Sequence, residues 1–296
     1  MSQPLDLPSA EASEPPLPPR RWWRGLLRTP SGIAGAVVMV VLLALSVTSW
    51  LGLTPYDPVA QNAAIRLQAP SGTHLFGTDL FGRDIFSRSV AGLANSVRVA
   101  VLAVAAAAFV GVLAGLLGGY FRGVTDAVSG GIANILFAFP PLLLALTLAS
   151  VLQRTWVTVA LAIAVVYVPI FYRVTRGPVL SLREREFVKA AVSTGQRPIE
   201  TALRHVLPNV SGLVVVQIAL SLSWAVLTEA ALSFLGLGTP PPAPSLGSMI
   251  FEAKNTAVLA PWTLYAPGVV VVLLVAALNL VGDALRDVLD PREEGR

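Results

Sequence analysis

The 296-residue sequence contains no cysteine, and only 13% of its residues are charged. Without cysteine the chain can form neither disulfide bonds nor thiolate metal sites. An average soluble domain carries roughly a quarter charged residues, about twice the share found here. Because 54% of the residues are hydrophobic and many occur in long runs, the composition indicates a polytopic membrane protein.

Nucleotide-binding and catalytic signatures are missing as well. No GxxxxGK[ST] phosphate loop occurs, so the chain is not itself an ATPase of that type. The two histidines, His74 and His205, are isolated, and no nucleophile stands beside a general base. We therefore expect no catalytic site, no metal site and no cofactor bound by this chain. We expect the basic residues behind the net charge of +4 to face anionic lipid headgroups and the cytoplasm, and we do not expect them to bind nucleic acid.

Six apolar segments are long enough to cross a bilayer, which takes roughly 20 residues of helix. These predicted spans cover residues 33–53, 97–120, 124–151, 156–174, 210–235 and 263–285. The sequence therefore predicts an all-α integral membrane protein with six transmembrane helices. An even number of spans places both termini on the same side.

The positions of the basic residues predict the orientation. Most of the 21 arginines and lysines lie on the side of the two termini, and cytoplasmic segments are enriched in such residues. The other side holds only Arg66, Arg83, Arg88, Arg98, Arg154 and Lys254. We therefore predict that both termini are cytoplasmic.

The regions outside the spans complete the predicted organisation. Residues 1–30 combine a disordered cytoplasmic tail, rich in proline and serine, with a basic, tryptophan-containing anchor that suits the membrane interface. They differ from a signal peptide, which begins with a basic region. The remaining predicted regions are a first transmembrane helix (31–54), an external loop (55–95), a five-helix core (96–290) with a cytoplasmic loop (181–208), and a cytoplasmic tail (291–296).

One basic, polar stretch, residues 184–208, interrupts the apolar segments. We predict a first helix that ends at Gly195 in a left-handed cap, and a second that begins at Pro198 and ends at Pro208. Apolar residues at four-residue intervals give the second helix one apolar face. They are Ile199, Leu203 and Leu207. The periodicity fits two interpretations, a loop resting on lipid headgroups or a docking element for a soluble partner.

Two features within the membrane segments are candidates for function. Pro140 and Pro141 interrupt the third span, which fits either a packing kink or a segment lining a translocation path. Glu229 is an acid near the outer end of a span, where Lys254 or water could satisfy it, so we favour a structural role. The candidate path residues are Phe139, Pro140, Pro141, Gln217 and Glu229.

The motif GTDLFGRD precedes the second span on the predicted outer side. Its two carboxylates have no further hard ligand nearby and make a poor metal site. We favour a tight turn in which Asp84 caps the following helix. The loop lies on the predicted external face of the protein, and its candidate residues are Gly77, Asp79, Arg83 and Asp84.

The order of several motifs resembles one family of transport proteins. Ala190, Ala191 and Gly195, followed by Leu207 and Pro208, are similar to the EAA…G…LP loop of ABC importer permeases. HLFGTDLFGRDIFSR, FAFPPLLLAL and EAALSFLGLGTPPPAPSLG stand in matching positions. Together they resemble the dipeptide, oligopeptide and nickel class of permeases (DppC/OppC-like) over about residues 25–292.

The resemblance implies a type I ABC importer permease fold in the bacterial plasma membrane. It implies three kinds of protein partner: a homologous permease, two cytoplasmic ATPases that carry ATP and Mg²⁺, and an external substrate-binding protein. The cargo would be di- or oligopeptides. The 184–208 loop would couple to the ATPases. The residues implied in coupling are Glu184, Glu186, Phe187, Lys189, Ala190, Ala191, Gly195, Leu207 and Pro208.

The sequence departs from the family motif at two positions. Lys189 stands where the motif begins with glutamate, and His205 replaces an apolar residue. Glu186, one turn earlier, could supply the carboxylate. The alternative function is an ATP-independent secondary transporter or a membrane scaffold. Ion-coupled carriers usually bury ionisable residues near the midplane, and the predicted spans show no clear one there.

Overall fold

The computed structural model describes residues 29–289. The predicted N-terminal tail and basic anchor up to residue 28, and the C-terminal tail, lie outside the described residues. Within them the chain is nearly all helical and has no β-sheet, in agreement with the predicted all-α class. The helices are α2 (Pro30–Trp50), α3 (Ile85–Phe121), α4 (Gly123–Ala138), α5 (Pro141–Val151), α6 (Trp156–Leu182), α7 (Glu186–Ser193), α8 (Pro198–Thr201), α9 (Leu207–Phe234), α10 (Leu246–Ala253) and α11 (Trp262–Leu289).

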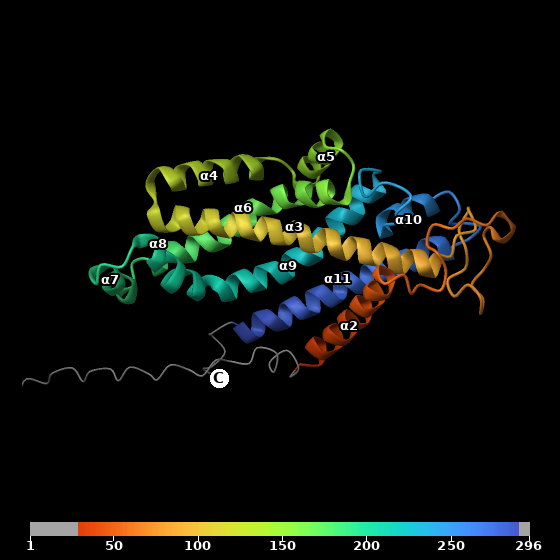
Figure 1. Cartoon of the computed structure of the whole chain (residues 1–296), viewed down its shortest axis with the longest axis horizontal. Helices are drawn as coiled ribbons and strands as arrows, with labels where there is room; N and C mark the ends of the chain where they lie inside the picture. The colour runs from red at the N-terminus through yellow and green to blue at the C-terminus, as the bar shows by residue number, and fades with distance from the viewer. Residues whose placement is uncertain (1–28, 290–296) are drawn as a thin grey trace, which may run out of the picture.

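The long helices run side by side along the molecule (Figure 1). Among the described residues, five helices are long and apolar enough to cross a membrane, or six if the bent pair α4–α5 is one span. The six predicted spans are therefore found, the third as a bent pair. Helices α7 and α8 lie at one end of the bundle, called here the α7 end. Helix α10 and the loop that precedes α3 lie at the other, the α10 end (Figure 1).

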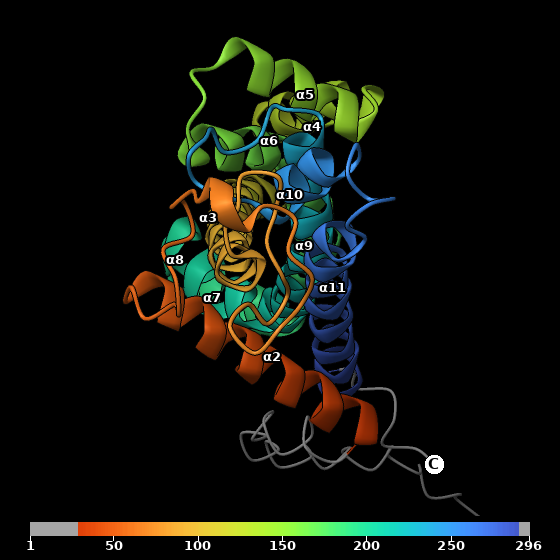
Figure 2. The same ribbon diagram turned by 90° about the vertical axis from the view of Figure 1, so that its right-hand side faces the viewer.

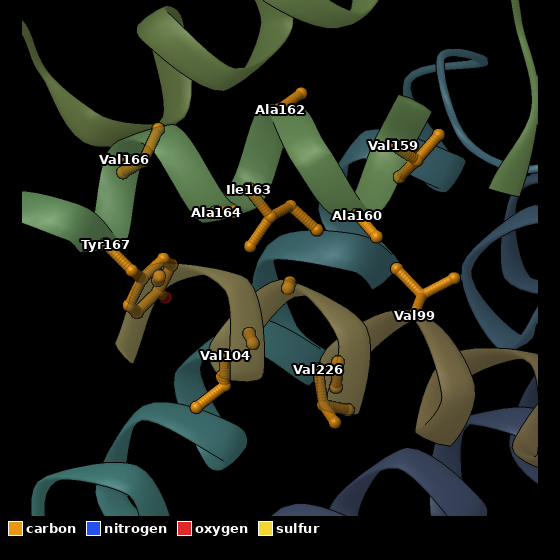
Figure 3. Close-up of a cluster of buried hydrophobic side chains, with 14 of the residues drawn as sticks. Val99, Val104, Val159, Ala160, Ala162, Ile163, Ala164, Val166, Tyr167 and Val226 are labelled. Atoms are coloured by element: carbon orange, nitrogen blue, oxygen red, sulfur yellow. The ribbon is translucent and has the colours of Figure 1, made fainter. Parts of the chain in front are cut away.

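Helices α3 and α6 form the centre of the bundle because glycines on α3 let the two backbones approach closely. A Cβ atom at Gly115 would lie 2.7 Å from the carbonyl oxygen of Tyr172. Small residues at such crossings allow tight helix packing in membranes. Further along the same two helices, branched side chains from three helices form a buried cluster, as Val104 of α3, Ile163 of α6 and Val226 of α9 illustrate (Figure 3).

Helix α3 begins at Ile85, well before the boundary expected at residue 96. The predicted external loop 55–95 is therefore too long. The first turns of α3 contain the polar residues Ser87, Arg88 and Asn95. They lower the local hydropathy, so the predicted span begins at residue 97 and leaves out this part of the helix. These side chains are buried against the preceding loop and the segments around α10, where Arg88 donates a hydrogen bond to the carbonyl oxygen of Pro58 (3.1 Å).

The third span turns through 95° between α4 and α5. Phe139 and Pro140 are both extended, with ψ angles of 139° and 128°. Each precedes a proline, and a residue in that position is excluded from the helical region by its clash with the proline ring. Two such residues in succession break the span, and Pro141 then starts a new helix at its first position, where no N–H is needed.

The prediction that Pro208 ends the second helix of the polar stretch is wrong. Helix α8 continues through a π-helical segment, Ala202–Val206, directly into α9. Leu207 donates its N–H to the carbonyl oxygen of Ala202, five residues earlier. A widened turn makes room for the proline ring, which would otherwise collide with the carbonyl four residues before it.

Candidate functional site

The polar stretch forms a hairpin at the α7 end, called here the Gly195 hairpin (residues 186–206). Gly195 has a φ angle of +83°, as the predicted left-handed cap requires. Its N–H donates to the carbonyl oxygen of Val192 (3.0 Å), and the N–H of Gln196 donates to that of Ala191 (3.3 Å). This pair of bonds is the Schellman motif, which satisfies the last carbonyl groups of α7.

Buried aliphatic residues anchor the hairpin to the membrane helices. Val188, Ala202 and Val206 are at most 1% exposed and join a cluster with Leu116 of α3 and Val179 of α6. The hairpin is therefore packed against the ends of two central spans and not suspended from them. Val188 of α7 therefore belongs to the same buried cluster as residues of α3 and α6.

His205 and Gln196 close the hairpin across its open side. A ring nitrogen, Nε2 of His205, lies 3.0 Å from Oε1 of Gln196, and the Thr201 hydroxyl lies 3.4 Å from the same oxygen. The family motif has an apolar residue where His205 stands. In this protein, the polar contact between His205 and Gln196 connects the π-helical segment to the turn that follows α7.

Four large apolar side chains of the hairpin are exposed. Phe187 and Val192 of α7, with Ile199 and Leu203 of the second helix, are 44 to 48% exposed. The predicted apolar face of the second helix is therefore present, and Ile199 and Leu203 on it are partly exposed. Four large exposed apolar side chains on so short a segment make the hairpin tip a candidate contact site.

Charged residues surround this apolar tip. Glu184 accepts a hydrogen bond from Arg122 (3.0 Å) and lies 3.7 Å from the ammonium nitrogen of Lys189. Glu200 pairs with Arg204 at 2.8 Å. Among the described residues Glu186 forms no ion pair, so it is the acid of the hairpin whose charge remains available.

A groove of about 630 Å³ lies where α4 and α5 break, and α6 and α9 form its other wall. Three predicted path residues line it together, namely Phe139, Pro141 and Gln217. The residues that line the groove are mainly apolar, and none of them is charged. The amide of Gln217 donates to Ser221 (3.1 Å), and the hydroxyl groups of Tyr167 and Thr228 lie 3.2 Å apart.

Sequence reasoning missed most of the α9 wall, although the sequence carried a signal. Gln217, Ser221, Trp224 and Thr228 follow at intervals of four, three and four residues, which places them on one face of a helix. Trp224 is 64% exposed within the groove wall. Polar side chains on one stripe of an apolar span mark the side that faces a polar ligand or another subunit.

Glu229 does not line the groove. Its carboxyl group is completely buried where α3 meets α9, and it accepts hydrogen bonds from the hydroxyl groups of Ser96 and Ser233, each at 2.6 Å. The predicted partner, Lys254, lies over the ring of Phe251 instead. The arrangement fits the structural role favoured from the sequence, with a different set of partners.

The GTDLFGRD motif forms a turn in which both acids have internal partners. Asp84 accepts from the N–H of Ser87 (2.8 Å) and so caps α3 as predicted, while its other oxygen bonds to Nδ1 of His74 (2.9 Å). Asp79 pairs with Arg83 at 2.5 Å. Gly77 and Gly82 have positive φ angles in this turn. His74 is therefore part of the cap.

Two arginines join this turn to α10. Arg83 and Arg88 both contact Oε2 of Glu252, at 2.5 and 3.3 Å. The side chain of Arg88 is 3% exposed, and we gave it no role from the sequence. Its position in the first turn of an otherwise apolar helix was the available signal.

Comparisons with known proteins agree with this geometry. Residues 107–295 match the family described as "Binding-protein-dependent transport system inner membrane component". The chain is 37% identical to the dipeptide transport system permease protein DppC of Alkalihalophilus pseudofirmus, over 93% of this chain and 90% of that protein. It is 36% identical to the glutathione transport system permease protein GsiD of Pectobacterium atrosepticum, over 93% and 91%.

A solved structure shares the fold at low sequence identity. The MetNI methionine ABC transporter, in inward-facing conformations, superimposes with a TM-score of 0.56 and 17% identity, covering 69% of this chain and 96% of that chain. The predicted ABC importer permease fold is therefore confirmed. The family match covers more than half of the sequence, and the relatives match nearly all of it. The chain belongs to the binding-protein-dependent transport system inner membrane components, multi-pass proteins of the bacterial inner membrane.

Proposed function

We propose that this protein is the permease subunit of an ATP-driven importer for di- and oligopeptides, and that a second, homologous permease completes its translocation pathway. Family membership supports the importer. The peptide cargo is supported by two relatives, one named for dipeptide transport and one for glutathione, which is itself a small peptide. A separate external binding protein selects the cargo and delivers it.

The proposed orientation places the α7 end and both termini in the cytoplasm. Basic residues gather at that end of the bundle, and the positive-inside rule assigns such an end to the cytoplasm. The basic residues in and beside the Gly195 hairpin are Arg183, Arg185, Lys189, Arg197 and Arg204, and Arg122 lies between α3 and α4 and bonds to Glu184. The α10 end then faces the binding protein, to which it offers the exposed apolar residues Leu80, Phe81, Val258 and Leu259.

The Gly195 hairpin is the proposed contact for the ATPase subunits, which bind ATP and Mg²⁺. The observation that carries this proposal is that α7 has one buried side and one exposed side. Val188 packs against the membrane helices, and its neighbour Phe187 is exposed. Protein interfaces combine such an apolar centre with a polar rim. Since a ligand shifts a conformational balance only by binding one state better, ATP must act on this chain through a mechanical contact.

Glu186 is the proposed charged partner of the ATPase. The family motif begins with glutamate where this chain has Lys189, but Lys189 faces Glu184. Glu186 lies in the first turn of α7, exposed and without an ion pair among the described residues. Glu186, one helical turn before Lys189, thus supplies the carboxylate that the motif has at the position of Lys189.

The groove between α4, α5, α6 and α9 is the proposed contribution of this subunit to the pathway. Its polar groups are an amide, three hydroxyls and the indole N–H of Trp224, which match the hydrogen-bonding groups of a peptide backbone and carry no charge. A neutral wall fits peptides of any side-chain charge. Selection among them then belongs to the binding protein.

The test is co-purification of ATPase activity with two matched variants. Phe187→Asp places a charge in the centre of the hairpin tip, and Val258→Asp makes the same change at a residue 96% exposed at the other end. We expect wild type and Val258→Asp to retain vanadate-sensitive ATPase activity from solubilised membranes, and Phe187→Asp to lose it. Equal recovery from both variants would contradict the proposal.

A further inference from the structure

A second, polar groove lies between α4 and α6, on the side of the bundle opposite α2 (Figure 2). Its volume is about 520 Å³, and it is called here the Arg173 groove. Its charged and polar lining residues are Asp126, Asn134, Tyr172, Arg173 and Arg176. None of them belongs to the Gly195 hairpin or lines the uncharged groove between α4, α5, α6 and α9, called here the neutral groove. The proposed function therefore leaves this cluster of charges unexplained.

Two of the three charges in the Arg173 groove neutralise each other. The guanidinium group of Arg176 donates two hydrogen bonds to the carboxylate of Asp126, one of them 2.6 Å long. The hydroxyl group of Tyr172 donates to the same carboxylate (2.9 Å). Arg173 is exposed and forms no ion pair among residues 29–289. It is therefore the cation of the groove that has no carboxylate partner.

The side chain of Arg173 extends away from the α7 end. The first turn of α4 lies at that end, and there Arg176 contacts Asp126 (Figure 1). Arg173 instead contacts residues two and three turns farther along α4. Its Nη2 atom donates to the side-chain oxygen of Asn134 (3.1 Å), and its guanidinium carbon lies 4.0 Å from the centre of the Phe137 ring. A long basic side chain that served only the lipid interface would extend toward the headgroups, which is the opposite direction.

The Arg173 groove adjoins the neutral groove. Phe137 lines the neutral groove and contacts Arg173, which lines the other. Charged side chains within a span face a water-filled cavity or a partner, because their exposure to hydrocarbon is costly. Added Cβ atoms at Gly131 and Gly177 would meet no atom within 4 Å, so both glycines leave their part of the Arg173 groove open. A molecule that moves from the neutral groove toward the α7 end therefore meets Arg173 next.

We propose that Arg173 binds the terminal carboxylate of the cargo peptide as the peptide passes from the neutral groove toward the α7 end. This inference rests on the peptide cargo of the proposed function. The Nε and Nη1 atoms of Arg173 have no partner among the described residues, and guanidinium N–H groups form short, charge-assisted hydrogen bonds to carboxylates. Asn134 and Phe137 hold the guanidinium group without a competing negative charge. Because every peptide with a free carboxyl end carries this group, the contact suits cargo of any side-chain sequence.

The experiment uses two photoreactive alanine tripeptides and the complete transporter in proteoliposomes. One peptide carries a diazirine-bearing photoleucine as its carboxyl-terminal residue, and the other carries it as its amino-terminal residue. Both keep the free carboxylate, so the binding protein meets the same end groups. The liposomes are illuminated during ATP-driven uptake, and cross-linked residues are mapped by mass spectrometry. Arg173→Gln removes the charge and Arg173→Lys keeps it. The matched control is the double variant Asp126→Asn with Arg176→Gln, which breaks the neighbouring ion pair between α4 and α6 and leaves Arg173 in place.

In the wild type we expect the carboxyl-terminal probe to label residues of the Arg173 groove, such as Gly131 and Asn134, at least fivefold more than the amino-terminal probe does. Arg173→Gln should abolish this difference, Arg173→Lys should retain part of it, and the double variant should retain it. Uptake without labelling of the groove, equal labelling by both probes, or a difference that survives Arg173→Gln would overturn the inference. Loss of the difference in the double variant as well would overturn it too, and would assign Arg173 the role of holding α4 on α6. Uptake of neither peptide by the wild type would instead contradict the proposed peptide import.

Discussion

Replacing Gly195 by valine should uncouple ATP hydrolysis from transport without harming membrane insertion. Its φ angle of +83° lies in the left-handed region, which costs a residue with a side chain about 1–2 kcal/mol. No atom lies within 4 Å of the position that a Cβ would take, so the penalty is confined to the backbone. A penalty of 1–2 kcal/mol shifts the balance between the native turn and its alternatives by a factor of about 5–30.

The change is local because the anchoring residues remain. The turn would reopen and release the bonds made by Gly195 and Gln196, while Val188 and Val206 stay buried against α3 and α6. The α7 helix would then be presented to the ATPase at a different angle. We therefore expect normal amounts of subunit in the membrane and a transport rate reduced at least fivefold.

The assay is ATP-driven peptide uptake into proteoliposomes that contain the complete transporter. Gly212→Val is the matched control, since Gly212 is a helical residue of α9 that also has no atom near its Cβ position. Gly195→Asn is the second control, because asparagine tolerates positive φ angles. Full uptake by Gly195→Val, or an equal loss in Gly212→Val, would refute the reasoning.

Three further predictions concern stability, each measured as the midpoint of thermal unfolding of the purified complex. Glu229→Leu leaves the buried hydroxyls of Ser96 and Ser233 without their acceptor and should cost about 1–3 kcal/mol, more than Glu229→Gln; equal midpoints would contradict this role. Asp84→Ala removes the cap of α3 and should cost about 0.5–2 kcal/mol, whereas Asp84→Asn should cost less; the reverse order would refute the capping role. Glu184→Gln breaks exposed ion pairs and should change stability by less than about 1 kcal/mol, so a larger loss would show that the hairpin depends on them.

Local chemistry could be predicted from the sequence with few errors. The six apolar segments, the left-handed Gly195 and the capping Asp84 each depend on a few neighbouring residues, and the structure confirms them. The cap at Asp84 predicted a helix from residue 85, but the span was predicted to begin only at residue 97 because hydropathy counts Arg88 as polar, although its guanidinium group is buried with its own partners. A polar residue can therefore lie inside a helix that composition alone would shorten.

Contacts between distant segments could not be predicted in the same way. The hydroxyl groups that bind Glu229 come from α3 and α9, and their distance depends on how those helices cross. The 95° turn after Phe139 follows from two prolines, but its direction is set by packing on α6 and α9. The π segment before Pro208 belongs to the same class, since a proline alone fits either a helix end or a widened turn.

The most direct test of the coupling account is site-specific cross-linking, which the absence of native cysteine makes clean. Glu186→Cys places the only thiol on the Gly195 hairpin, and Lys254→Cys places it just after α10 at the opposite end. In membranes that contain the complete transporter, we predict that the thiol at position 186 cross-links to an ATPase subunit and the thiol at position 254 does not. A cross-link to the ATPase from position 254 alone would reverse the proposed orientation, and none from position 186 would contradict the assignment of the hairpin as the coupling element.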